Sequence, residues 1–181
     1  MKITVSGKIG AGKTTVSKIL AKKLNLKYLS TGDVWREIAK EKGITITEFA
    51  KLAEKETKYH QELDKKTEEI GKIQDNFVFD SRLAFNFIPD SIKIFLDVNI
   101  EIAAKRIFNQ KREKEKENTD LEKTRKAIIT REQSELKAYQ ELYNLNHHDK
   151  ANYDLVIDTS KSNPEKIVNK IIELLKQKGK L

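Results

Sequence analysis

The sequence predicts an α/β fold in which a parallel five-stranded sheet carries helices on both faces. Three observations lead to this prediction. Five short apolar segments alternate along the chain with segments of helical periodicity. Such apolar runs are typical of strands that are buried on both faces of a parallel sheet. A glycine-rich stretch, GKIGAGKTT, lies between the first apolar segment and a helical one, where glycine is expected for its backbone freedom.

The individual elements follow from local patterns. The expected strands are ITVS (3–6), LKYLS (26–30), NFVFD (76–80), IKIFLD (92–97) and YDLVID (153–158). Helices are expected after the glycines, after a turn at STGD (30–33), after a capping box at Thr45 and Glu48, over residues 59–71 with a stop near Gly71, from Ile100, over about 121–143, and after Asn163-Pro164. The 181 residues then form one domain, residues 1–181.

Composition excludes several classes of protein. The chain has no cysteine, which excludes a disulfide framework and a thiolate metal site. Its apolar runs are too short to cross a bilayer, so we expect a cytoplasmic protein with no membrane partner. The net charge is +8, but the lysines are spread along the chain and interleaved with glutamates. This pattern favours a solvated, ion-paired surface over a nucleic-acid binding face.

The glycine-rich stretch is the strongest functional signal. GKIGAGKT, residues 7–14, matches the Walker A pattern in its required strand–loop–helix context, and therefore predicts a nucleotide site. The expected ATP-binding residues are Gly7, Lys8, Ile9, Gly10, Ala11, Gly12, Lys13, Thr14 and Thr15. In such a loop the glycines let backbone N–H groups surround a phosphate, and the following helix points its positive end at it. Lys13 would reach the β- and γ-phosphates and Thr14 would bind Mg²⁺, whereas Lys8 is expected to be exposed.

Polar residues at the other strand ends extend this site. The aspartates Asp80 and Asp97 and the segment DTS (158–160) all follow expected strands, whose carboxyl ends meet at one edge of the sheet. Arg36 follows STGD and Arg82 follows the third strand. Because a guanidinium group binds phosphate through two parallel N–H groups, these arginines are candidates for a second phosphate opposite the loop.

At these residues the chain resembles the nucleoside monophosphate kinases, and among them the short, archaeal-type cytidylate kinases. The segments that carry the resemblance are GKIGAGKTT, LSTGDVWRE, DSRLAF, REQSELKAYQELYNL and YDLVIDTS. The resemblance implies a P-loop NTPase-type fold with a helical acceptor-binding insertion, about residues 31–70, and a short mobile lid, about 108–120. It implies transfer of the γ-phosphoryl group of ATP to CMP or dCMP, with Mg²⁺ as the cofactor. We expect a monomer.

The resemblance also assigns roles to single residues. Thr31, Asp33, Arg36 and Arg82 would bind the acceptor monophosphate. Asp80 would hold Mg²⁺ through water, Arg131 would clamp the transferring phosphoryl group, and Arg106 would contact ATP.

Where the family usually has glycine and an acid before the arginine of the third strand, this chain has Asp80-Ser81. Where the family usually has a second arginine after Arg131, this chain has Ala138. We expect Lys137, Arg112 or Arg125 to supply that charge.

Several alternatives remain open. The acceptor could be AMP or a small non-nucleotide, or the chain could be a basic P-loop ATPase that binds RNA. His147-His148-Asp149 resembles a fragment of a metal site, but nothing nearby completes a ligand set, so a solvated loop is expected. Trp35 is expected to be partly buried beside the STGD turn rather than to stack on a base.

Overall fold

The computed structural model describes residues 1–110 and 120–181. The strands are β1 (Lys2–Gly7), β2 (Lys27–Ser30), β3 (Phe77–Asp80), β4 (Ile92–Asp97) and β5 (Leu155–Asp158). The helices are α1 (Lys13–Leu24), α2 (Thr31–Glu41), α3 (Ile46–Lys55), α4 (Lys58–Ile73), α5 (Ala84–Phe87), α6 (Ile100–Asn109), α7 (Leu121–Tyr143) and α8 (Pro164–Gln177), with a 3₁₀ turn, η1 (Lys150–Asn152). The predicted lid at 108–120 falls mostly on residues 111–119, which lie outside the described part of the chain.

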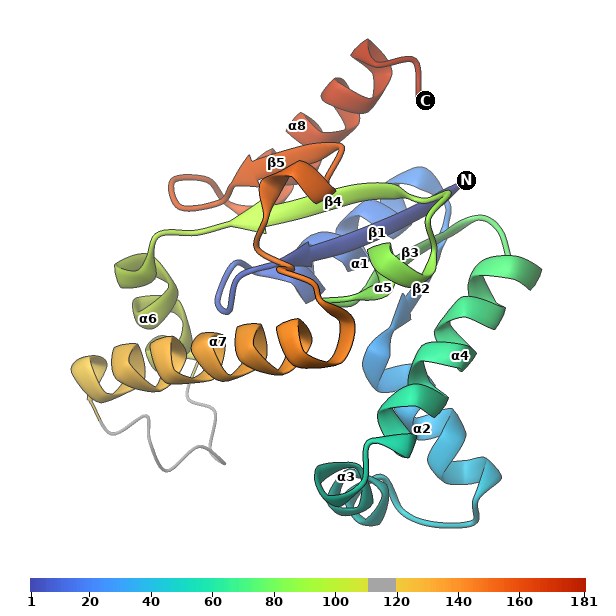
Figure 1. Cartoon of the computed structure of the whole chain (residues 1–181). Coiled ribbons are helices and arrows are strands. Elements are labelled where there is room, and N and C mark those ends of the chain that lie inside the picture. Colours follow the sequence, from blue (N-terminus) through green and yellow to red (C-terminus); the bar gives the residue numbers. More distant parts are fainter. Residues whose placement is uncertain (111–119) are drawn as a thin grey trace.

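The five strands form one parallel sheet in the order β2-β3-β1-β4-β5 (Figure 1). β1 is the central strand, and its Val5 pairs with Asp80 of β3 and with Ile94 of β4. Ser30 at the end of β2 pairs in turn with Asp80. The register therefore brings the carboxyl ends of three strands together beside the glycine-rich loop, which confirms the predicted fold class.

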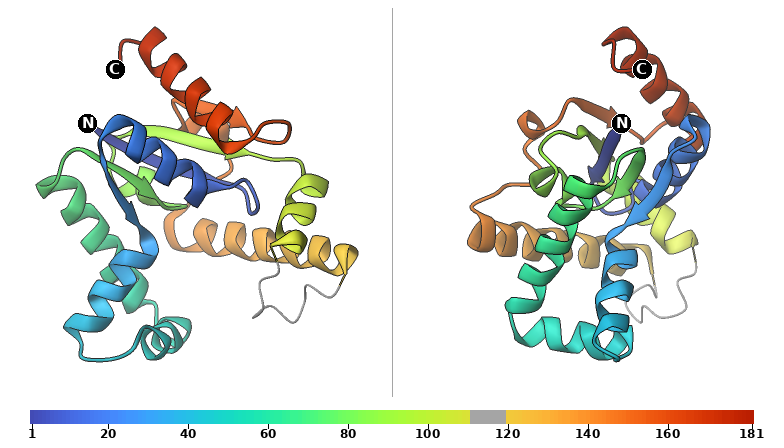
Figure 2. Two further views of the ribbon diagram at one scale, coloured as in Figure 1. Left: turned by 180° about the vertical axis from the view of Figure 1, so that it is seen from behind. Right: turned by 90° about the vertical axis from the view of Figure 1, so that its right-hand side faces the viewer.

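Alternate side chains of the strands enter separate hydrophobic clusters. Val78 of β3 and Ile94 of β4 pack with α1 and α8, which lie side by side on one face of the sheet (Figure 2). Phe77 and Phe79 point the other way, into a cluster shared with α2, α4 and α5. Each of these buried side chains contributes roughly 1.5–3 kcal/mol to stability through removal of apolar surface from water. Helices thus cover both faces, as predicted.

The helix boundaries agree with most of the predicted caps. Thr45 and Glu48 form the predicted capping box of α3, with each side chain bonded to the other's backbone N–H. Asn163 caps α8, with Pro164 at its first position. No helix in the described ranges combines the length and the apolar character that a membrane crossing requires.

Two predicted helix signals play other parts in the structure. STGD is not a separate turn, because α2 begins at Thr31 and only Ser30 precedes it as the cap that accepts the Asp33 N–H. The helix stops near Gly71 as predicted, at Ile73, but Gly71 is not its C-cap, which is Gln74. The reason for Gly71 is packing: a Cβ there would lie 2.9 Å from Cγ1 of Ile88. A glycine required for close packing of a helix and a glycine required as a C-cap cannot be distinguished from the sequence alone.

Candidate functional site

The glycine-rich loop connects β1 to α1 in a conformation that needs its glycines. Gly7 has φ +145°, and a Cβ at this position would lie 2.3 Å from the carbonyl oxygen of Leu96. Gly10 has φ +79°, and its Cβ would clash with Ala103 at 2.8 Å. Behind the loop, the Ile9 N–H donates to Oε1 of Glu132 on α7 at 3.0 Å. The loop is thus fixed between β4, α6 and α7, with the first turn of α1 opening onto a cavity.

Lys13 begins α1 and provides the central positive charge of the loop. Its Nζ donates to the carbonyl oxygen of Gly7 at 3.2 Å. Burial, followed by repulsion from Arg82, lowers the pKa of Lys13 to about 8, although Asp80 and Glu135 act in the opposite direction. The ammonium is therefore poorly solvated and close to other cations, which makes it a strong partner for an anion.

Thr14 and Asp80 form a hydroxyl–carboxylate pair next to Lys13. The Thr14 hydroxyl donates to Oδ2 of Asp80 at 2.6 Å, and Tyr28 donates to the same oxygen at 3.2 Å. A hydroxyl beside a single carboxylate fits the requirements of Mg²⁺, which keeps most of its waters and binds one or two carboxylates together with substrate phosphates. No group of three or more potential His, Cys, Asp or Glu ligands occurs among the described residues, and this type of Mg²⁺ site needs none.

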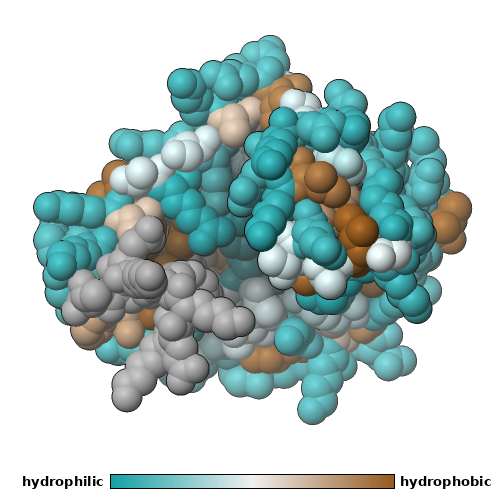
Figure 3. Space-filling model, turned by 90° about the horizontal axis from the view of Figure 1, so that it is seen from below, coloured by the Kyte–Doolittle hydropathy of each residue, from teal (hydrophilic) through white to brown (hydrophobic). Residues whose placement is uncertain are grey.

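The loop forms one wall of a cavity of about 1250 Å³. α2, α4, α5 and α7 contribute the other walls, and residues 162–164 with Ile167 close the side nearest α8. Seen from below, the molecule is hollowed near the middle of this face, and hydrophilic side chains cover much of the visible surface around it (Figure 3). A cavity of this size has room for two small ligands at once.

Two arginines line the cavity near Lys13, and one carboxylate holds both. Nε of Arg82 lies 2.7 Å from Oε2 of Glu135, and Nε of Arg131 lies 3.0 Å from Oε1 of the same side chain. The fold positions Arg82 further, because the Ser6 hydroxyl donates to its carbonyl oxygen at 3.0 Å. The geometry thus places two fixed guanidinium groups near Lys13, an arrangement suited to more than one phosphate group.

The remaining predicted arginines lie at the two sides of the cavity. Arg36 is on α2, pairs with Asp33 and keeps more than half of its side chain exposed. Arg106 is on α6 and donates to the carbonyl oxygens of Gly10 and Thr159 at 3.3 and 2.6 Å. All the predicted residues of the loop from Ile9 to Thr15 line the cavity, as do Thr31, Asp33, Arg36, Asp80, Arg82, Arg106 and Arg131.

Comparisons with known proteins agree with this arrangement. The sequence profile of the cytidylate kinase-like family matches residues 2–161. The chain belongs to this family. It is 40% identical to a cytidylate kinase of Methanocaldococcus jannaschii over 174 residues, which cover 93% of this chain and 94% of the relative. It is 36% identical to a cytidylate kinase of Methanococcoides burtonii, with 89% of each chain covered.

Solved structures support the fold. A shikimate kinase of Bacteroides thetaiotaomicron matches with a TM-score of 0.65 and 18% identity, covering 97% of this chain and 98% of that chain. A shikimate kinase of Acinetobacter baumannii, solved with shikimate, matches with a TM-score of 0.64 and 21% identity, covering 98% and 93%. The prediction of a phosphotransferase of the cytidylate kinase type is thereby confirmed at the level of the family.

Some residues predicted near the site lie elsewhere. Lys8 is not free in solvent, because its Nζ lies 2.8 Å from Oδ1 of Asp97, on the side of the loop away from the cavity. Lys150 binds the other oxygen of Asp97 at 2.7 Å. Asp97 thus anchors the loop from behind instead of facing a ligand. An ion pair between residues 89 positions apart is invisible in the local sequence.

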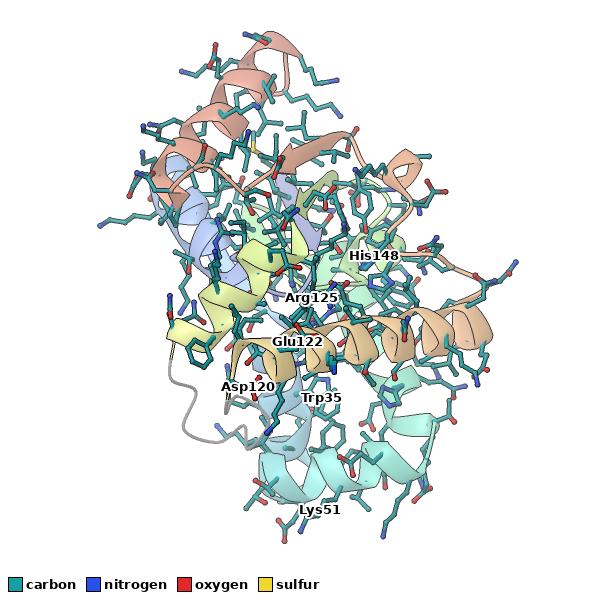
Figure 4. The ribbon with its side chains drawn as sticks, turned by 90° about the vertical axis from the view of Figure 1, so that its left-hand side faces the viewer. Trp35, Lys51, Asp120, Glu122, Arg125 and His148 are labelled. Carbon is teal, nitrogen blue, oxygen red and sulfur yellow. The ribbon has the colours of Figure 1, made fainter. Side chains whose placement is uncertain are left out.

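The charge that the family usually has at Ala138 is not replaced by two of its predicted substitutes. Ala138 lines the cavity, but Lys137 is 78% exposed and points to Glu141. Arg125 reaches from α7 toward α6, where its Nε lies 2.7 Å from Oε1 of Glu101 (Figure 4). Arg112 lies outside the described residues. One residue along a helix turns the side chain by about 100°, which explains the outward position of Lys137.

His147 is buried rather than solvated, contrary to the prediction for this loop. It is fully inaccessible, and its ring packs 4.8 Å from that of Tyr139. Neither ring nitrogen has a hydrogen-bond partner within the described part of the chain. Burial, followed by the neighbouring His148, lowers the pKa of His147 to about 3, so the imidazole is neutral. The residue supports the wall of the cavity.

Trp35 is half-buried, lines the cavity and meets Phe49 edge to face, as expected.

Several residues of the site were missed in the sequence. Glu135 follows Arg131 by four positions and Tyr139 follows it by eight, so helical spacing alone places all three on one face of α7. That signal could have been used. By contrast, Asp64 of α4 accepts a hydrogen bond from Tyr143 of α7 at 2.6 Å across 79 residues, and no local pattern indicates this contact.

Proposed function

We propose that the protein transfers the γ-phosphoryl group of ATP to CMP or dCMP. The observation that carries this proposal is the distribution of charge in the cavity. Lys13 and the loop line the cavity, and the guanidinium groups of Arg82 and Arg131 line it close to Lys13. Phosphoryl transfer depends on positioning and on neutralising charge, and it requires no nucleophilic side chain. A lysine and two arginines in one cavity suit two phosphate-bearing ligands, and the family relatives support cytidine as the acceptor nucleoside.

The donor occupies the loop side in this proposal. Backbone N–H groups of residues 12–15 surround the β- and γ-phosphates of ATP, and Lys13 bridges them. Arg106 lies between the loop and Thr159, where it supports the donor nucleotide. Thr14 through its hydroxyl and Asp80 through water would hold Mg²⁺, which supplies further neutralisation of the phosphate charge.

The acceptor occupies the opposite side. Arg82 binds the acceptor phosphate, with Arg36, Asp33 and Thr31 at the start of α2 completing its surroundings. We assign α2, α3 and α4, which lie together beside the sheet (Figure 1), to the acceptor-binding part of the molecule, close to the predicted residues 31–70. Arg131 contacts the phosphoryl group during its transfer. The phosphoryl group then passes directly from donor to acceptor with no covalent intermediate on the protein.

A coupled assay of ADP formation with a panel of acceptors tests this proposal. The panel contains CMP, dCMP, UMP, AMP and shikimate, the ligand named for one structural neighbour. We expect kcat/KM for CMP and dCMP to exceed the other values by about tenfold or more. A higher kcat/KM for AMP or shikimate than for CMP would show that the acceptor is not a cytidine nucleotide. ADP formation that is independent of any acceptor, combined with salt-sensitive RNA binding, would instead support an RNA-associated ATPase.

A further inference from the structure

Asp64 is one of three carboxylates that line the cavity, together with Asp33 and Asp80. It lies on α4, is half-buried and lines the cavity with His60, four residues before it. Within the described residues it forms no ion pair with a lysine or arginine. Burial raises the pKa of Asp64, and the hydrogen bond from Tyr143 opposes that shift. A negative charge here lowers the affinity for a nucleotide unless the ligand offers it a hydrogen-bond donor.

The contacts of Asp64 leave one oxygen available. The Tyr143 hydroxyl donates to Oδ2 at 2.6 Å, which fixes the orientation of the carboxylate. No hydrogen bond to Oδ1 occurs among the described residues. Aromatic side chains line the same cavity: Tyr143 packs against Phe87, with ring centroids 5.7 Å apart, and Trp35 packs against His60 at 6.2 Å. An oriented acceptor among aromatic side chains is typical of a site for a flat polar ring.

The position of this pair relative to the phosphate-binding arginines fits a nucleotide. Glu135, which holds Arg82, precedes Tyr143 by eight residues of α7, or about 12 Å at the rise of an α-helix. A ribose and a pyrimidine ring span a distance of this order when the phosphate lies on Arg82. The cationic end and the carboxylate end therefore match the two ends of one extended nucleoside monophosphate.

We infer that Asp64, oriented by Tyr143, reads the exocyclic amino group of the acceptor base and so selects cytosine over uracil. This inference rests on the proposed function. A carboxylate oxygen accepts a hydrogen bond from the N4 amino group of cytosine, whereas uracil presents the acceptor O4 at the same place. Asp64 does not take part in the transfer itself. It determines specificity.

A competing explanation is that the hydrogen bond merely ties α4 to α7. Two variants separate the explanations. Asp64→Asn keeps an acceptor for Tyr143 but replaces the second oxygen with an N–H₂ group, which suits O4 of uracil. Tyr143→Phe removes the tie and keeps the carboxylate. Glu62→Gln on the same helix, where Glu62 pairs with Lys42 at 2.9 Å outside the cavity, is the matched control.

The test measures kcat/KM for CMP and UMP in the wild type and all three variants. In Asp64→Asn we expect the ratio of CMP to UMP to fall about tenfold or more, with ATP affinity unchanged. In Glu62→Gln the ratio should be unchanged. In Tyr143→Phe, where the carboxylate stays but loses its orienting hydrogen bond, the ratio should fall less than in Asp64→Asn. An unchanged ratio in Asp64→Asn, or an effect confined to Tyr143→Phe, would overturn the inference.

A measurement on the unmodified protein removes dependence on the folding of any variant. The 2-pyrimidinone ribonucleotide lacks only the amino group of CMP, and we expect its kcat/KM to be about tenfold or more below that of CMP. Equal values would overturn the inference while leaving the proposed function intact. If the wild type uses neither CMP nor dCMP, the proposed function itself fails, and this outcome differs from both.

Discussion

Lys13 shows how strongly the fold changes the chemistry of one residue. Its side chain is enclosed by the loop and lies near Arg82 and Arg131, so the pKa of Lys13 falls to about 8. The protonated form is therefore present below about pH 8 and is lost above it. An anionic ligand favours the charged ammonium, so binding of a triphosphate raises this pKa again.

The pH dependence of ATP use should report this shift. We expect kcat/KM for ATP to fall as the pH rises through about 8, because this parameter reflects the free protein. At saturating ATP, kcat should stay level to a higher pH. Lys13→Arg serves as the control, since a guanidinium keeps its proton in this range. The variant should turn over more slowly, but its kcat/KM for ATP should not fall as the pH rises through about 8. If kcat/KM for ATP falls in the same way above about pH 8 in Lys13→Arg, the titrating group is not Lys13.

Arg36 and Arg82 differ from Arg125 in what they face. The first two line the cavity, whereas Arg125 pairs with Glu101 outside it. Arg36→Ala and Arg82→Ala should each weaken acceptor binding by about 1.5–3 kcal/mol and leave ATP binding nearly unchanged. Arg125→Ala should alter neither. Calorimetry with each nucleotide separately measures both. Equal losses for donor and acceptor in Arg82→Ala would contradict the assignment of this arginine.

At the scale of elements, α4 depends on a glycine that its sequence pattern misrepresents. Gly71 lies in the last turns of the helix, against Ile88, which is buried. Alanine normally stabilises a helix by up to about 1 kcal/mol relative to glycine. Here the added Cβ would approach Cγ1 and Cγ2 of Ile88 to 2.9 and 3.1 Å. The clash outweighs the helix propensity because a buried, β-branched side chain has few alternative positions.

Gly71→Ala should therefore lower the free energy of unfolding by about 1–3 kcal/mol, as measured by urea denaturation. The double variant Gly71→Ala/Ile88→Ala provides the control, because alanine lacks both γ carbons that the new Cβ would meet. It should be less destabilised than the sum of its two single changes. A stability gain in Gly71→Ala alone would show that Ile88 moves aside freely.

At the scale of the whole molecule, the features that could be predicted are those that a local sequence pattern indicates. Apolar runs indicated all five strands, the Walker A spacing gave the loop, and Thr45 with Glu48 gave a helix start. The sequence did not indicate that Lys8 binds Asp97, that His147 is buried, or that Asp64 meets Tyr143. Each of these depends on residues that only tertiary packing brings together. The loop and the arginines that line the cavity were therefore largely predicted, and the pairing of Asp64 with Tyr143 was not.

The central claim is that one cavity passes a phosphoryl group from ATP to a cytidine monophosphate. The most direct measurement incubates the protein with γ-labelled ATP and CMP and identifies the labelled product by chromatography. We expect the label in CDP. In Lys13→Ala the rate of CDP formation should be about a hundredfold lower, because the variant lacks the charge that neutralises the phosphates. Label found only in inorganic phosphate, at a rate that CMP does not change, would contradict the central claim.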